Sequence, residues 1–229
     1  MTVEGRPVPP PLTERQEARR RRILDASVRL AGRGGFDAVQ MREVAEEAEV
    51  ALGTLYRYFP SKVHLLVATM RDQLDGLHAT LRKRPPDGDG PAERVAETLM
   101  RAFRALQREP QLADAMVRAL TFADRSVSEE VEAVSRQTTA IILDAMRLAP
   151  TAEEPPAAGP AGAGALPGAG AEELPAAGPA GAGPEELAAV RVVEHTWYSA
   201  LISWLSGRAS IEQVETDLRT ACRLLPPAP

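Results

Sequence analysis

The chain has 229 residues, a net charge of −5 and an apolar content of 44%, which fit a soluble globular protein of one large or two small domains. Its one cysteine excludes an intramolecular disulfide, residues 1–22 lack the apolar stretch of a secretion signal, and no apolar run approaches the ~20 residues of a membrane span. These features predict a cytoplasmic protein. Residues 1–62 contain 11 Lys and Arg and 9 Asp and Glu, so this segment is slightly basic. The negative net charge of the whole chain therefore does not exclude binding of this segment to a polyanion.

Helical periodicity runs through most of the chain, and no stretch alternates with the period of a strand, so the fold class is predicted to be all-α. Residues 1–12 contain four prolines and are predicted to form a disordered arm. Thr13 and Gln16 match a capping box that starts the first helix, and glycines at 32, 34 and 35 stop it. Two short helices are expected over 41–48 and 52–59, and a longer one from Ser61 towards Arg84.

The second half is predicted to form helices over 91–108, 110–122, 127–148, 185–207 and 210–225. Between the third and fourth of these, residues 150–184 are almost entirely Ala, Gly and Pro with a few Glu. AEEPPAAGPAGAG at 152–164 recurs there as AEELPAAGPAGAG at 171–183. Such a segment buries too little apolar surface to offset its ordering entropy, so a disordered insertion is predicted. A repeated fold is the rival interpretation, but the period is too short and too rich in proline for a solenoid.

The stretch FDAVQMREVAEEAEVALGTLYRYFPSKVHLL over 36–66 predicts a helix-turn-helix, because two short helices flank a tight turn. Ala45 is small where the helices must approach, and the residues expected to point inwards are Phe36, Val44, Val50, Leu55 and Phe59. The exposed face of the second helix then carries hydroxyls, a guanidinium and a glycine, which suit a DNA groove and its phosphates. Taken singly, Tyr56 and Tyr58 are more often packed aromatics, and Arg57 is more often a solvated charge. Their combination in GTLYRYFPSK is far more specific.

Residues 20–66 resemble the TetR-type repressors, on the evidence of GGF, MREVA and GTLYRYFPSK. The resemblance implies that Leu52 and Gly53 approach base edges and that the remaining contacts mostly hold phosphates. Those phosphate contacts are Thr54, Tyr56, Arg57, Tyr58 and Lys62, and the resemblance implies a further contact from Arg42 in the preceding helix. Two positions depart from the family pattern, since Glu49 stands where the turn often has glycine and Ala51 where Ser or Thr would cap the helix. A lost cap costs about 1 kcal/mol.

The arginine run at 19–22 admits two interpretations that the sequence leaves open: a solvated helix face, or a basic arm that follows the DNA backbone. The expected domains are a disordered arm at 1–12, a helix-turn-helix domain at 13–62 and a larger helical ligand-binding and dimerisation domain at 63–225. The last of these contains the 150–184 insertion.

LQREPQLADAMVRALTFAD and HTWYSALISWLSGRAS resemble the branch of the family that represses sterol catabolism. The resemblance implies a small-molecule effector, an acyl-CoA thioester of a sterol breakdown product. Apolar residues expected to contact it are Phe103, Leu106, Met116, Leu120, Phe122, Ile142 and Trp197, although most such residues in any helical domain are plain core. Two alternatives stay open: a regulator of other fatty-acid or efflux genes, and a constitutive DNA-binding protein without a ligand.

Residues 185–225 carry long apolar stripes, with Leu201 and Leu218 mid-stripe, and are predicted to form a homodimer interface that matches a palindromic operator. Trp197, Tyr198 and Trp204 are candidate anchors there, with core or pocket placement equally open for Trp197. The three histidines lie on separate segments, and the sequence has no metal-ligand spacing, phosphate loop or nucleophile elbow. No catalytic residue, metal or cofactor is therefore predicted, and no membrane partner.

Overall fold

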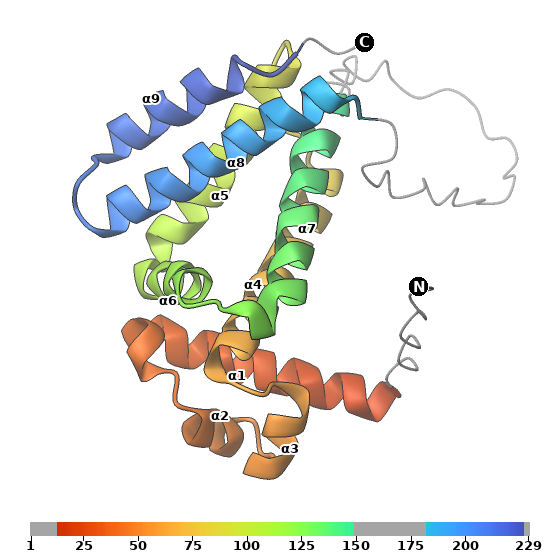
Figure 1. Ribbon diagram of the computed structural model, residues 1–229, viewed down its shortest axis with the longest axis vertical. Helices are drawn as coiled ribbons and strands as arrows, with labels where there is room; N and C mark the ends of the chain where they lie inside the picture. The colour runs from red at the N-terminus through yellow and green to blue at the C-terminus, as the bar shows by residue number, and fades with distance from the viewer. Residues whose placement is uncertain (1–12, 149–181, 227–229) are drawn as a thin grey trace, which may run out of the picture. The chain divides into compact units, whose positions relative to one another are not determined.

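The computed structural model describes residues 13–148 and 182–226, and all regular structure within these ranges is helical (Figure 1). Most helix bounds lie within two residues of the sequence predictions, but α1 extends past the predicted stop at glycines 32, 34 and 35 to Ala38, and α9 ends at Cys222, before the predicted residue 225. In chain order they are α1 (Glu14–Ala38), α2 (Met41–Glu47), α3 (Leu52–Tyr58), α4 (Lys62–Lys83), α5 (Pro91–Arg108), α6 (Pro110–Thr121), the 3₁₀ turn η1 (Arg125–Val127), α7 (Ser128–Arg147), α8 (Pro184–Leu205) and α9 (Ile211–Cys222).

The predicted disordered arm at 1–12 lies outside the described residues, and so does nearly all of the predicted insertion at 150–184. Its last residue, Pro184, is described and forms the first turn of α8, where proline is favoured because its missing N–H has no partner in a helix anyway. The described chain divides into two compact units: residues 13–74 with 105–134, and residues 75–104 with 135–148 and 182–226. The domain boundary at residue 62 stays a prediction.

The first unit is built around α1, whose inward positions Ile23, Leu24 and Leu30 are almost fully buried. α6 belongs to this unit and packs along α1 (Figure 1). Its apolar residues Leu112 and Met116 enter the same core as the helix-turn-helix. The spacing of these two residues places them on one face of α6, so burial of that face fixes α6 against α1 and the helix-turn-helix.

The ends of α1 follow directly from its sequence. Thr13 and Gln16 form the predicted capping box, which satisfies two free N–H groups at the start of the helix. Near its other end α1 is kinked, because Gly34 and Gly35 have non-helical backbone angles. Gly35 has φ +68, and a Cβ there would lie 2.7 Å from a carboxylate oxygen of Asp114 on α6. Glycine at this position therefore serves both the turn and the close approach of α6.

The second unit has α8 and α9 side by side (Figure 1). Leu201 and Leu218 are 6% and 0% exposed within this unit. The expectation that they face a partner chain is wrong, because a side chain already buried in its own unit has no surface left to offer. The two tryptophans also pack inside the unit: ring centroids of Trp197 and Trp204 lie 6.5 and 5.1 Å from that of Phe103, edge to face.

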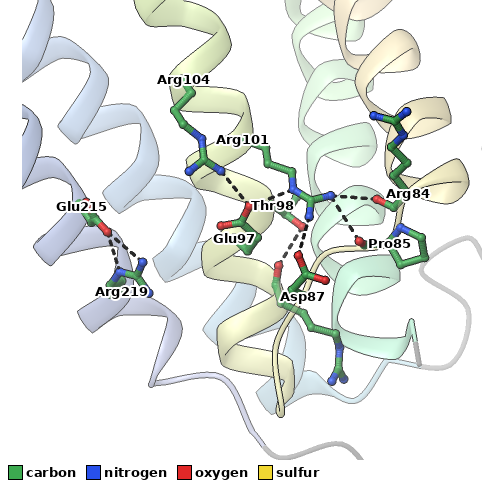
Figure 2. Close-up of polar contacts among 10 residues, drawn as sticks. Arg84, Pro85, Asp87, Glu97, Thr98, Arg101, Arg104, Glu215 and Arg219 are labelled. Carbon is green, nitrogen blue, oxygen red and sulfur yellow. Dashed lines mark hydrogen bonds and ion pairs between the residues drawn. The ribbon is translucent and has the colours of Figure 1, made fainter. Parts of the chain in front are cut away.

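Two arginines of α5 satisfy carbonyl groups at the ends of neighbouring helices in the second unit. Buried Arg94 donates to the carbonyls of Ala145 and Met146 in the last turn of α7, at 3.2 and 2.6 Å. Arg101 donates to the carbonyl of Arg84, just beyond α4, at 2.9 Å, and also pairs with Glu97 (Figure 2). Cations are favourable at these positions because the final carbonyls of a helix lack internal partners and carry partial negative charge.

Candidate nucleic-acid interface

α2 and α3 form a helix-turn-helix with a closely packed inner side. Val44 and Leu55 are fully buried and Ala45 is 3% exposed, as expected for the positions where the two helices meet. The N–H of Val50 donates to the carbonyl of Ala45 at 2.9 Å and closes the turn, although the Val50 side chain is only half-buried. Phe36 and Phe59 complete the predicted inner set. The opposite side of α3 is thereby held towards solvent in a fixed orientation.

Both departures from the family pattern leave a local defect in this turn. Glu49 has φ +54, the one positive value among the described non-glycine residues. That conformation costs a residue with a Cβ about 1–2 kcal/mol relative to glycine. Ala51 occupies the cap position of α3 and provides no side-chain hydrogen bond. The N-terminus of α3 is therefore less stabilised than a helix with a serine or threonine cap.

The predicted contact face of α3 is open to solvent. Tyr56 is 47% exposed, Gly53 and Arg57 are exposed, and Leu52 and Thr54 are half-buried. No protein atom lies within 4 Å of the place where a Cβ on Gly53 would stand. The fold therefore does not require glycine here. A glycine on an exposed helix face costs stability, so its presence points to something outside the chain that approaches this backbone closely.

Tyr58 and Lys62 are already engaged by other residues of the first unit. The Tyr58 hydroxyl donates to the backbone carbonyl of Gln16 at 3.4 Å. The Lys62 ammonium donates to the carbonyl of Phe36 at 3.0 Å and lies 4.1 Å from the centre of its ring. Burial lowers the pKa of this ammonium. Tyr58 thereby fastens α3 to α1, and Lys62 fastens α4 to α1. Their phosphate contacts stay predictions, as does the DNA contact of exposed Arg42.

The Phe36 ring also joins α1 to α6. The Arg118 guanidinium lies 4.8 Å from the Phe36 ring centre and pairs with Asp37 at 2.7 Å. This pair lowers the pKa of the Asp37 carboxyl through its hydrogen bond to Arg118. Phe122, predicted to contact an effector, is 55% exposed and packs 5.3 Å from Phe36. This cluster was not predictable from the sequence, because Asp37 and Arg118 are too far apart in the chain for any periodic signal.

The predicted effector residues are divided between the two units. Phe103, Ile142 and Trp197 lie in the second unit, where the structure brings Phe103 and Trp197 together. Phe103 and Ile142 are fully buried, whereas Trp197 is half-buried. The first unit contains Leu106, Met116, Leu120 and Phe122, of which Met116 is a core residue of that unit. The seven residues therefore do not belong to one compact unit.

A groove of about 490 Å³ runs between α8 and α9. Its walls combine hydroxyl-bearing and small residues with two apolar ones, Val192 and Leu224, and none of the predicted effector residues lines it. The walls are Val192, Thr196, Ser199, Ala200, Ser203, Arg208, Ala209, Gln213, Asp217, Thr220, Ala221 and Leu224. Such an open, half-polar surface differs from the enclosed apolar cavities that hold small ligands.

Within residues 13–148 and 182–226, three or more His, Cys, Asp or Glu side chains nowhere gather as a metal site would require. In the same ranges, each helix is too short or too polar to span a bilayer.

Comparison with known protein families identifies the family to which this chain belongs. Residues 23–69 match the model of bacterial regulatory proteins of the tetR family, and residues 88–158 and 172–225 match the tetracyclin repressor-like C-terminal domain. The chain belongs to the TetR family and is a TetR-type transcriptional repressor.

Its relatives include the transcriptional repressors named KstR. The chain is 39% identical to KstR of Rhodococcus jostii over 92% of its length and 84% of the relative's. It is 37% identical to KstR of Mycobacterium tuberculosis over 93% and 83%. A solved TetR regulator from Rhodococcus sp. RHA1 superposes with a TM-score of 0.70 at 35% identity, covering 93% of this chain and 97% of that one. FadR of Bacillus subtilis, solved in complex with stearoyl-CoA, shares the fold at a TM-score of 0.55 and 15% identity over 89% and 96% of the two chains.

Proposed function

We propose that the protein represses genes of sterol catabolism by binding a palindromic operator as a two-fold dimer, and that an acyl-CoA thioester releases it. The single observation that carries the DNA-contact assignment is Gly53, which the fold does not need and which lies on the open face of α3. Around it, Leu52 reaches base edges, while Thr54, Tyr56 and Arg57 bind phosphates. Arg42, Tyr58 and Lys62 complete the contacts.

A dimer is needed because one recognition helix reads too few base pairs, whereas two read half-sites about 34 Å apart. We assign the interface to residues 185–225, at the groove between α8 and α9. Val192 and Leu224 line this groove and are 44% and 62% exposed. A helix pair from each copy then forms a four-helix bundle, which buries these side chains in both copies at once. The burial of Leu201 and Leu218 assigns them to the protein's own core instead.

The effector assignment is supported by similarity to the KstR repressors and by the aromatic wall of Phe103, Trp197 and Trp204. Half-buried indoles beside a buried phenyl ring suit the apolar rings of a sterol derivative. Of the predicted effector residues, Phe103, Ile142 and Trp197 are retained for this role. The thioester releases DNA only if it binds more tightly to the state that does not fit the operator.

The test begins with selection of bound duplexes from random DNA, followed by gel shifts of the selected operator. A sterol-derived acyl-CoA should release it, while free coenzyme A and the free acid should not. Both tryptophans pack on Phe103, so quenching of their fluorescence should report the same binding, and Phe103→Leu should weaken it. Equal release by stearoyl-CoA would instead indicate a fatty-acid regulator. Release by no thioester would remove the effector assignment, and absence of a selected sequence would remove specific DNA binding.

A further inference from the structure

Four arginines share one flank of α1. Arg15, Arg22 and Arg29 are spaced by seven residues, which is two helical turns, and Arg33 follows one turn after the last. Three of them bind the end of α2: Arg29 and Arg33 pair with the Glu47 carboxylate at 2.6 and 3.3 Å, and Arg22 donates to the Ala48 carbonyl at 3.4 Å. This flank of α1 therefore faces the end of α2 and the turn that leads to α3.

Arg15 lies on the same flank of α1, two helical turns before Arg22. It is exposed, and within the described part of the chain it has no hydrogen-bond or ion-pair partner. Arg19 lies one turn further along α1 and is half-buried. It too has no hydrogen-bond or ion-pair partner among the described residues. Of the other residues of the run, Arg20 pairs with Glu17 and Arg22 is bound to the turn, whereas Arg21 is exposed on another flank of α1.

The first turn of α1 lies against the end of the recognition helix. The Tyr58 hydroxyl, in the last residue of α3, donates to the Gln16 carbonyl between Arg15 and Arg19. Two cations with no partner among residues 13–148 and 182–226 thus lie beside the helix that we propose enters the groove. The capping box of Thr13 holds this turn in helical form, so the two guanidinium groups extend from an ordered scaffold.

We propose that Arg15 and Arg19 bind phosphates of the operator backbone next to the stretch covered by α3. The inference rests on the proposed DNA contact of α3 and adds a phosphate-binding surface on α1. Guanidinium groups are well matched to phosphate oxygens, and such contacts strengthen binding without reading sequence. They also offset the exposed carboxylates of Glu43 and Glu46 on α2, which repel the same backbone.

The experiment measures the salt dependence of operator binding for Arg15→Gln and Arg19→Gln in the full-length protein. Each phosphate contact contributes about 0.9 to the slope of log K against log salt, so each substitution should reduce the slope of a dimer by about 2. Relative affinities for operator variants should not change. Arg21→Gln is the matched control, because Arg21 is an exposed residue of the same helix on another flank. It should retain the wild-type slope.

Wild-type slopes for both Arg15→Gln and Arg19→Gln would overturn the inference. An equal fall for Arg21→Gln would also overturn it, since it would show only a loss of overall charge. Thermal melting of each variant shows that the fold is kept. If the wild-type protein binds no selected sequence, the proposed function has failed; if it binds and only the slopes disagree, the α1 contact alone has failed.

Discussion

Replacing Gly53 by alanine should stabilise the free protein while weakening its hold on DNA. The backbone at Gly53 is helical, and a Cβ there would meet no protein atom within 4 Å. An alanine methyl is therefore accommodated without strain. Glycine inside a helix costs about 0.5–1 kcal/mol relative to alanine, so the free energy of unfolding should rise by roughly that amount. Its place in the first turn of α3 favours the lower end of this range.

The same methyl group holds the α3 backbone away from the groove. A spoiled base contact costs about 1–3 kcal/mol, and a two-fold complex contains the substitution twice. The expected loss is thus at least about 2 kcal/mol, or roughly a 30-fold rise in Kd. Opposite signs for stability and affinity distinguish this outcome from ordinary damage to the fold, which lowers both.

Thermal denaturation and fluorescence anisotropy with the selected operator, at one fixed salt concentration, measure the two effects. Gly76→Ala provides the control, because Gly76 is an exposed helical residue of α4 whose Cβ would also meet nothing within 4 Å. It should gain similar stability and keep wild-type affinity. Wild-type affinity in Gly53→Ala would refute the close approach of DNA at this residue, and a loss of stability would refute the open space around it.

Three further predictions concern the turn, the partner surface and one ion pair. Glu49→Gly and Ala51→Ser should each raise the free energy of unfolding by about 1 kcal/mol in a urea titration, because they relieve a left-handed residue and supply a helix cap; no gain would contradict the assigned defects. Val192→Glu should sediment as a monomer, whereas Ile211→Glu, exposed but outside the groove, should stay a dimer; a dimeric Val192→Glu would place the interface elsewhere. The pKa of Asp37 is lowered by its arginine partner, so the pair stabilises the protein above about pH 4 and is lost below it. Asp37→Asn should remove that part of the acid-induced fall in melting temperature, and an unchanged profile would contradict it.

The helices and the inner side of the helix-turn-helix were predictable because their signals are local. A period of 3.6 residues and the caps at Thr13 and Ser61 are visible within a few turns of chain. The defects at Glu49 and Ala51 were predictable too, since turn and cap conformations depend on only a few neighbouring residues.

What surrounds a buried residue was not predictable. An apolar stripe shows that Leu201 and Leu218 are covered, but it does not distinguish their own unit from a partner chain. Lys62 likewise carries the residue type of a phosphate ligand, yet its ammonium lies on a carbonyl 26 residues earlier in the chain. Such pairings depend on how distant segments meet, and a periodic pattern in one segment holds no information about the other.

The sharing of one core between α6 and the helix-turn-helix limits how this protein can be recombined with others. Leu112, Met116 and the close contact at Gly35 tie residues 105–134 to α1. A chimaera that exchanges only the first 70 or so residues between relatives would pair an α1 from one parent with an α6 from the other. Grafts designed to redirect such a repressor to a new operator should therefore carry both segments, or restrict the exchange to the solvent-facing residues of α3.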